Sequence, residues 1–176
     1  SDLVNFVRLA HTKIMHKPED YSRDVMQKIA AKYAKQAKNI NQTRSANMTD
    51  NTVIMILSET FSDPTRVPGV SFSEDPMSNI RQLKTWTTSG LMLSPGYGGG
   101  TANIEYQALT GLSMANYNSA LSVAYQQLVP SLKWTPSLNQ AWNAANGEDA
   151  SVALHAYNRN MYFRDINYKK FAFSKF

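Results

Sequence analysis

The chain has 176 residues, 43% of them hydrophobic and 11% aromatic, which is typical of a folded globular protein and excludes a disordered one. Its length suits one domain with a sizeable core. The absence of cysteine excludes disulfides, zinc-thiolate sites and cysteine nucleophiles. Within these residues we expect neither a membrane-spanning segment nor a signal peptide, because no apolar run is long enough.

The net charge of +5 is unevenly distributed. Residues 1–44 hold nine Lys/Arg and four Asp/Glu, whereas residues 45–176 hold nine of each. The basic segment is either a solvated helical face or a surface for an anionic membrane or another polyanion. Its charges are spread along the chain without a dense cluster, so we expect no nucleic-acid partner.

The chain divides into an N-terminal helical segment and a larger domain. Residues 1–45 predict two helices separated by a break at a proline. The second helix is expected to be capped by Asp20 or Ser22 and to run to about Ala37. A polar linker follows, and the larger domain spans 46–176.

Strands and helices alternate along the larger domain. The uninterrupted apolar run at 52–58 predicts a strand buried on both faces, which is typical of a parallel sheet covered by helices. Two shorter strands are expected at 89–93 and 150–154. The predicted fold class is therefore α/β, with a mainly parallel sheet flanked by helices. Helices are expected at 77–86, 101–112, 137–146 and within 159–175, with one further turn near 124–128.

Three polar positions follow the predicted strands, where ligands bind in open α/β sheets. Glu59 comes directly after the first strand, and its carboxylate either binds a cation or forms a cap or salt bridge. His155 ends the third strand and is either structural or acts with Arg164, because arginine pairs with phosphate. We expect His11 and His16 to be surface or packing residues.

The third position is the glycine-rich loop that ends at Thr101. Glycines before a helix expose backbone N–H groups that favour an anion such as phosphate. A P-loop would need lysine directly before the Ser or Thr, and Gly100 stands there instead. The Thr101 hydroxyl either caps the helix or faces a phosphate. A metal ion beside it would lower its pKa and make it a nucleophile.

Three segments, Val53–Asp63, Gly90–Gly111 and Val152–Asn158, together resemble the lipoteichoic acid synthase-like phosphoglycerol transferases of the sulfatase and alkaline phosphatase superfamily. The block from Gly98 to Gly111, with Glu59 upstream, is the most specific part. The resemblance implies the first half of an alkaline phosphatase/sulfatase-like domain. It also implies that the N-terminal segment is a helical connector that follows a membrane region.

The resemblance also implies residue roles. Glu59 and Thr101 would bind a divalent metal, commonly Mn²⁺, and Thr101 would be the nucleophile that forms a phospho-threonine intermediate. The donor would be a phosphatidylglycerol-like lipid and the acceptor a glycolipid or polymer. His155 and Arg164 match positions that hold the glycerophosphate group. The catalytic domain would lie outside a bacterial cell membrane.

The family completes its metal site with an Asp-His pair that is not found up to Phe176. We therefore expect residues 1–176 alone to bind metal weakly or not at all, to be inactive, and to self-associate through an uncovered sheet. Two departures stand near the expected site: Gly100, where the synthases often have lysine, and Met161 with Tyr162, where an aromatic pair is usual.

Other functions remain open on the sequence alone. A sulfatase, phosphoethanolamine transferase or phosphodiesterase of the same superfamily would use the same nucleophile and metal. A degenerate, non-catalytic relative would bind an anionic glycolipid or polymer without turnover.

Overall fold

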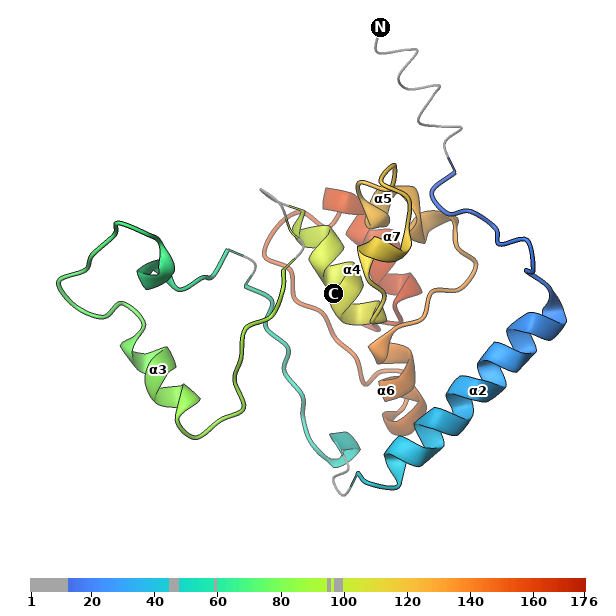
Figure 1. Cartoon of the computed structure of the whole chain (residues 1–176), viewed down its shortest axis with the longest axis horizontal. Helices are drawn as coiled ribbons and strands as arrows, with labels where there is room; N and C mark the ends of the chain where they lie inside the picture. Colours follow the sequence, from blue (N-terminus) through green and yellow to red (C-terminus); the bar gives the residue numbers. More distant parts are fainter. Residues whose placement is uncertain (1–12, 45–47, 59, 95, 97–99) are drawn as a thin grey trace, which may run out of the picture.

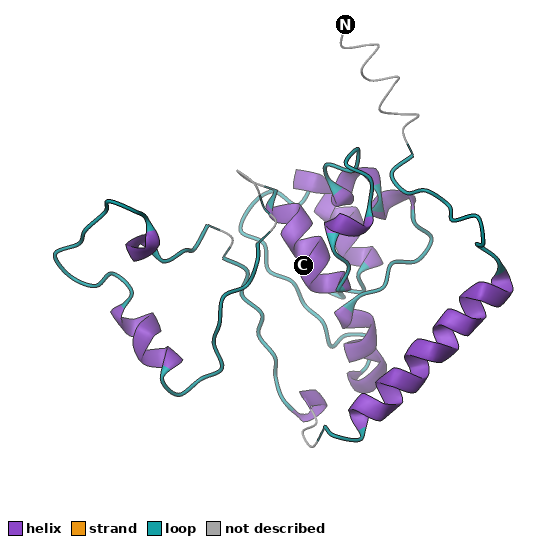
Figure 2. Ribbon diagram, in the orientation of Figure 1, coloured by secondary structure: helices purple, strands orange, loops and turns teal. Residues whose placement is uncertain are grey.

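The computed structural model describes residues 13–44, 48–58, 60–94, 96 and 100–176. Within these ranges the regular structure is helical, and Figure 2 shows helices joined by loops. The α-helices are α2 (Arg23–Asn41), α3 (Ser78–Lys84), α4 (Thr101–Thr110), α5 (Ala124–Gln127), α6 (Leu138–Asn146) and α7 (Arg164–Lys170). Short 3₁₀ turns lie at Met48–Asp50, Pro64–Arg66, Met114–Asn116, Val129–Ser131 and Met161–Phe163.

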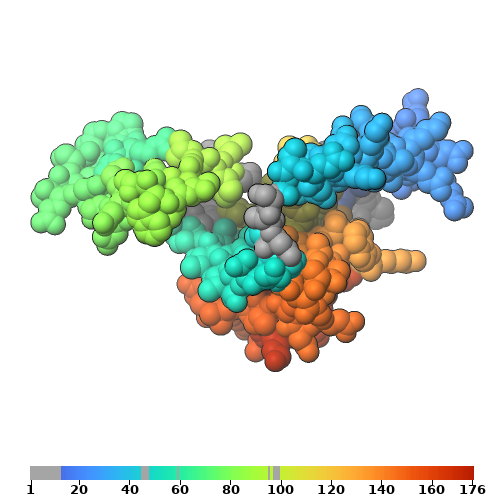
Figure 3. Space-filling model, turned by 90° about the horizontal axis from the view of Figure 1, so that it is seen from below, coloured from blue at the N-terminus to red at the C-terminus, as the bar shows by residue number. Residues whose placement is uncertain are grey.

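The helices form three groups in space. Figure 1 shows α4, α5, α6 and α7 gathered in the middle, α2 along one side, and a lobe that carries α3 on the other. Figure 3 shows α2 and the α3 lobe projecting in opposite directions. None of the described helices is long and apolar enough to cross a membrane.

Helix α2 confirms the predicted helix and its cap. The Ser22 hydroxyl accepts a hydrogen bond from Val25 N at 3.3 Å, which satisfies one of the free N–H groups at the helix start. The helix continues past its expected end to Asn41. No residue of α2 is buried, so the basic residues along it are solvated. The first predicted helix lies mostly outside the described residues.

The other predicted helices are also present, and most of their ends lie within two residues of the predicted ones. Ser137 caps α6 by accepting a hydrogen bond from Gln140 N at 3.2 Å, and Gly147 ends it. Gly111 ends α4 in the left-handed region, with φ of 70°, as glycine does at helix C-termini. The predicted C-terminal helix is shorter than expected, since α7 covers only part of 159–175.

The core lies between α4, α5 and α7. The rings of Tyr125 and Phe171 meet with centroids 5.5 Å apart, and Tyr106 donates to or accepts from the Tyr117 hydroxyl at 2.6 Å. The first contact joins α5 to the end of α7, and the second joins α4 to the segment that precedes α5. The buried cluster consists of Ala102, Tyr106, Leu121, Ala124, Tyr125, Leu128, Val129, Tyr168 and Phe171.

The parallel sheet is not confirmed. The segments at 52–58, 89–93 and 150–154 contain no strand among the described residues, where the β pairing is an isolated parallel bridge between Val152 and Lys175. A strand with apolar residues on both faces is stable only when neighbours pair its edges and helices cover its faces. These segments lack such cover: exposure reaches 86% at Ile56, 92% at Leu93 and 99% at Leu154.

The α3 lobe is held by Arg81. Its Nε lies 2.7 Å from the Asp75 carboxylate, and its Nη2 lies 3.2 Å from that of Asp63. Asp63 also accepts hydrogen bonds from the backbone and hydroxyl of Thr65. Asp63, the last residue of the segment Val53–Asp63, therefore holds the lobe together through Arg81 and Thr65.

Candidate functional site

Thr101 is the first residue of α4 and is half-buried. Gly100 before it has φ of 91°, in the left-handed region where residues with a Cβ are strained. The first hydrogen bond of the helix runs from Asn103 N to Gly100 O at 2.8 Å. A helix N-terminus of this kind favours negative charge beside it.

Asn103 fixes this end of α4 to the segment before α5. Its Nδ2 donates to Ser122 O at 2.7 Å, and its Oδ1 accepts from Ala124 N at 2.9 Å. Two hydrogen bonds from one side chain in opposite senses hold both position and orientation. The helix turn that carries Thr101 is thus attached to the core next to its N-terminus.

Glu59, the predicted acidic metal ligand, lies outside the described residues. Among the residues that are described, no three His, Cys, Asp or Glu side chains come together in a way that could hold a metal ion. Thr101 offers one hydroxyl, and a divalent cation needs several oxygen ligands.

Arg164, predicted to bind phosphate, is buried with a side-chain exposure of 2% and forms an ion pair with Glu105. Its Nη2 lies 2.6 Å from Oε1, and its Nε lies 3.1 Å from Oε2. Its Nη1 donates to Met161 O at 3.0 Å. These contacts tie the guanidinium to α4 through Glu105 and to its own segment through Met161.

The carboxylate of Glu105 also accepts a hydrogen bond from Tyr168 and lies near a second tyrosine, Tyr125. Tyr168 donates its hydroxyl to Oε2 at 3.2 Å, and burial followed by the charge of Glu105 raises the pKa of Tyr168 to about 12. Burial and then Glu105 also raise the pKa of Tyr125. The Tyr125 hydroxyl is buried and has no hydrogen-bond partner among the described residues. Burial opposes the charge of Arg164, but its contacts with Glu105 outweigh it and raise its pKa.

The backbone before Arg164 is strained. Tyr162 and Phe163 both have φ of 56°, a region that costs residues with a Cβ about 1–2 kcal/mol each. Asn167 compensates, since its buried Nδ2 donates to Tyr162 O and to Tyr125 O, each at 2.9 Å. The guanidinium of Arg164 lies over the Tyr162 ring, 5.5 Å from its centroid. Several independent contacts therefore hold the Arg164 side chain in one position.

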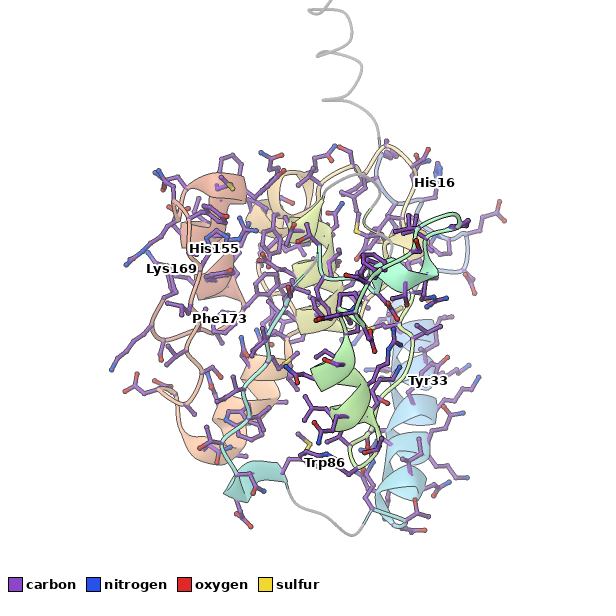
Figure 4. The ribbon with its side chains drawn as sticks, turned by 90° about the vertical axis from the view of Figure 1, so that its left-hand side faces the viewer. His16, Tyr33, Trp86, His155, Lys169 and Phe173 are labelled. Atoms are coloured by element: carbon purple, nitrogen blue, oxygen red, sulfur yellow. The ribbon has the colours of Figure 1, made fainter. Side chains whose placement is uncertain are left out.

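His155 is half-buried and makes local contacts. Tyr157 N donates to its Nδ1 at 3.3 Å, and the two rings meet edge to face with centroids 5.7 Å apart. The same Nδ1 lies 3.2 Å from Tyr157 O, so both polar contacts of the ring are with Tyr157. Figure 4 shows His155 on the side of the molecule that carries α7 and Lys169. The described hydrogen bonds do not join it to Arg164, so the two predicted substrate-binding residues are not brought together by direct contact.

Glu105 and Tyr168 are the site residues that the sequence prediction missed. Glu105 follows Thr101 by four residues on α4, and Tyr168 follows Arg164 by four on α7, which places each pair on one helix face. The sequence signal for the ion pair was the presence of an acidic residue, Glu105, and a basic residue, Arg164, near the predicted site. The pairing of the two helices across 59 residues was not visible in the sequence.

Comparison with known proteins gives two relatives at the same level of identity. A protein named "Putative cyclic beta-1,2-glucan modification protein" from Rhizobium meliloti (strain 1021) is 40% identical over 125 residues, which is 70% of this chain and 18% of that protein. The solved structure of the Streptococcus pyogenes phosphoglycerol transferase GacH, in complex with sn-glycerol-1-phosphate, is also 40% identical. It matches with a TM-score of 0.83 over 93% of this chain and 42% of its own.

The likeness to the solved structure shows that the described helices and loops belong to an alkaline phosphatase/sulfatase-like fold. The chain spans less than half of that structure's chain and about a fifth of the curated relative. Residues 51–176 match the sulfatase family, and they include Thr101, Glu105, His155 and Arg164. The chain therefore belongs to the sulfatase family.

Proposed function

We propose that the protein carrying this chain is a metal-dependent phosphoglycerol transferase with Thr101 as nucleophile. The observation that carries the proposal is the place of Thr101 at the start of α4, one turn before the Glu105–Arg164 pair, in a chain 40% identical to a phosphoglycerol transferase. The chain spans 42% of that structure's chain, so the activity is proposed for the whole protein.

The proposed reaction has two displacements at phosphorus. The Oγ of Thr101 attacks the phosphorus of a phosphatidylglycerol-like donor, and the bond from phosphorus to the diacylglycerol oxygen breaks. Diacylglycerol leaves with the proton that Thr101 loses, and the glycerophosphoryl group stays on Thr101. An acceptor hydroxyl then attacks the same phosphorus, and Thr101 recovers its proton from that hydroxyl.

Each residue of this chain would have a separate role in the proposed reaction. The N–H groups at the start of α4 would lie against the phosphoryl oxygens, where a helix N-terminus favours negative charge. Arg164 would bind the same group through its guanidinium, and His155 would bind it through its ring. Glu59 and Thr101 would hold a divalent metal, for which we propose Mn²⁺. Such an ion lowers the pKa of a hydroxyl and stabilises charge at phosphorus.

The acceptor is proposed from the relatives. The resemblance to lipoteichoic acid synthases suggests a glycolipid or a growing polymer. The relative named for cyclic β-1,2-glucan modification favours a second candidate, a glucan hydroxyl. Both acceptors present a sugar or glycerol hydroxyl, so the chemistry at Thr101 is the same in each case.

A lipid donor places the proposed reaction at a membrane. We propose that the whole protein is attached to a bacterial cell membrane and that this domain lies on its outer side. Phosphatidylglycerol would then reach Thr101 from the outer leaflet.

The test uses the whole protein with Mn²⁺ and vesicles that contain fluorescent phosphatidylglycerol. We expect release of fluorescent diacylglycerol, loss of release in Thr101→Ala, and a glycerophosphoryl adduct on the Thr101 peptide by mass spectrometry. An adduct on another residue would refute the assignment of the nucleophile. Binding of the lipid without turnover would favour the non-catalytic alternative, and turnover of sulfate or phosphoethanolamine esters instead would identify another activity of the superfamily.

A further inference from the structure

We propose that Glu105 is a positioning residue, which fixes the orientation in which the guanidinium of Arg164 acts on the phosphoryl group that Thr101 carries. The proposal rests on the proposed function, since it assigns how one phosphate-binding group of that site is oriented.

The first support is the geometry of the contact. Glu105 binds Arg164 through Nε and Nη2, at 3.1 and 2.6 Å, which is a side-on, two-point contact. Such a contact fixes the plane of the guanidinium as well as its position. The orientation of the whole guanidinium relative to α4 is then fixed.

The second support is the position of Glu105 on α4. Glu105 and Thr101 are four residues apart on one helix face, so the carboxylate lies about 6 Å further along the helix axis than the nucleophile. The guanidinium is tied to the helix that carries Thr101, and the two move together. An arginine anchored only on α7 would not keep this spacing.

The third support is the amount of structure that converges on one side chain. Tyr168 donates to Glu105, the Arg164 guanidinium lies over two aromatic rings, and two strained residues directly precede it. Strained backbone of this kind persists where the surroundings over-determine it, and it clusters at functional sites.

The experiment compares variants of the whole protein in the donor-cleavage assay with Mn²⁺ and fluorescent phosphatidylglycerol vesicles. Glu105→Gln keeps the shape of the side chain and removes its charge, and we expect kcat/KM to fall about 10- to 100-fold. Glu105→Asp keeps the charge and should recover part of this loss. Tyr106→Phe is the matched control, because it removes a buried hydrogen bond from the same helix without touching the pair.

A structural role and a positioning role differ in two readouts. If Glu105 only stabilises the fold, Glu105→Gln and Tyr106→Phe will lower kcat/KM alike at equal loss of melting temperature, which would overturn the proposal. If Glu105 acts through Arg164, Glu105→Gln will have little further effect in an Arg164→Lys background. The reason is that a lysine ammonium cannot donate the two parallel hydrogen bonds that the guanidinium donates to the carboxylate. Multiplying effects in that background would also overturn it.

A second variant and a comparison with Thr101→Ala keep the proposal testable, whatever the result for Glu105→Gln. Should Glu105→Gln fail to fold, Tyr168→Phe removes one contact to the same carboxylate and should lower kcat/KM about fivefold. Unchanged kinetics in Tyr168→Phe would then contradict the proposal. A wild-type protein that is no more active than Thr101→Ala overturns the proposed function and this inference together. An active wild type with an equally active Glu105→Gln overturns the inference alone.

Discussion

Arg164 meets the carboxylate of Glu105 side-on, with Nη2 at 2.6 Å from Oε1, across 59 residues of sequence. The two side chains are 2% and 12% exposed. The pair joins α7 to the helix that begins at Thr101, and a tyrosine hydroxyl completes it. A buried pair of this kind is costly to break from one side only, because the remaining charge is left without a partner.

We predict that Glu105→Ala destabilises the protein by about 3–5 kcal/mol, since it leaves the Arg164 charge buried and unpaired. Urea unfolding followed by circular dichroism measures this change. The matched double variant, Glu105→Leu with Arg164→Met, removes both charges and keeps apolar volume. It should lose less stability than Glu105→Ala alone, and an equal or larger loss would contradict this account.

A second prediction concerns Asn167, whose buried Nδ2 donates to two backbone carbonyls. Asn167→Ala leaves both carbonyls without this donor and should cost about 2–3 kcal/mol. Asn146→Ala is the control, because the Asn146 side chain donates to Trp142 O at the exposed end of α6. The control should cost less than about 0.5 kcal/mol. Equal losses in the two variants would show that the Asn167 contacts are unimportant.

A third prediction follows from the positive φ of Phe163, whose ring is 43% exposed. Phe163→Gly removes the left-handed strain with little loss of packing, and it should raise the free energy of unfolding by about 1 kcal/mol. Ala172→Gly, at φ of 65°, should act in the same direction. Tyr157→Gly, at an exposed position without positive φ, should lower stability. Thermal unfolding of the three variants side by side checks the order.

A fourth prediction is a loss of stability at alkaline pH. The pKa of Tyr168 is raised to about 12 from an ordinary value of 10.0, so the unfolded chain releases this proton first. The stability that the neutral hydroxyl contributes is complete below pH 10 and is lost as the pH rises toward about 12. Burial raises the pKa of Tyr106 and Tyr125 in the same direction. Urea midpoints measured across this range should fall less steeply in Tyr168→Phe.

A fifth prediction concerns residues 1–176 expressed alone. Ile56, Leu93 and Leu154 are 86%, 92% and 99% exposed, and apolar surface of this extent drives association. We expect self-association by sedimentation velocity and no Mn²⁺-dependent donor cleavage. Replacing the three residues with serine should shift the sample toward monomer. A wild-type monomer, or measurable turnover, would contradict these expectations.

The local elements were predictable from local chemistry. Ser22 and Ser137 cap helices as expected, and Gly111 and Gly147 end them, because caps and left-handed glycines act within one helical turn. The match to the sulfatase family confirms the resemblance that was read from the glycine-rich block and its neighbours. Such signals need no knowledge of distant contacts.

The sheet and the ion pair depend on contacts between distant residues. The apolar run at 52–58 was interpreted as a buried strand, but a strand needs paired neighbours, and the described residues supply none for it. Arg164 was assigned to phosphate on the basis of resemblance, whereas its partner Glu105 lies on another helix. The catalytic role of Thr101 and the binding roles of Glu59, His155 and Arg164 remain predictions.

The place of Arg164 in the chain also orders events during synthesis. Glu105 and Thr101 leave the ribosome before α7 does, and until then the Glu105 carboxylate has neither Arg164 nor Tyr168 to bind. Helix α4, which begins at Thr101, can therefore complete its packing only after residue 168 has been synthesised. A nascent chain that stops short of α7 would leave the Glu105 carboxylate without either partner.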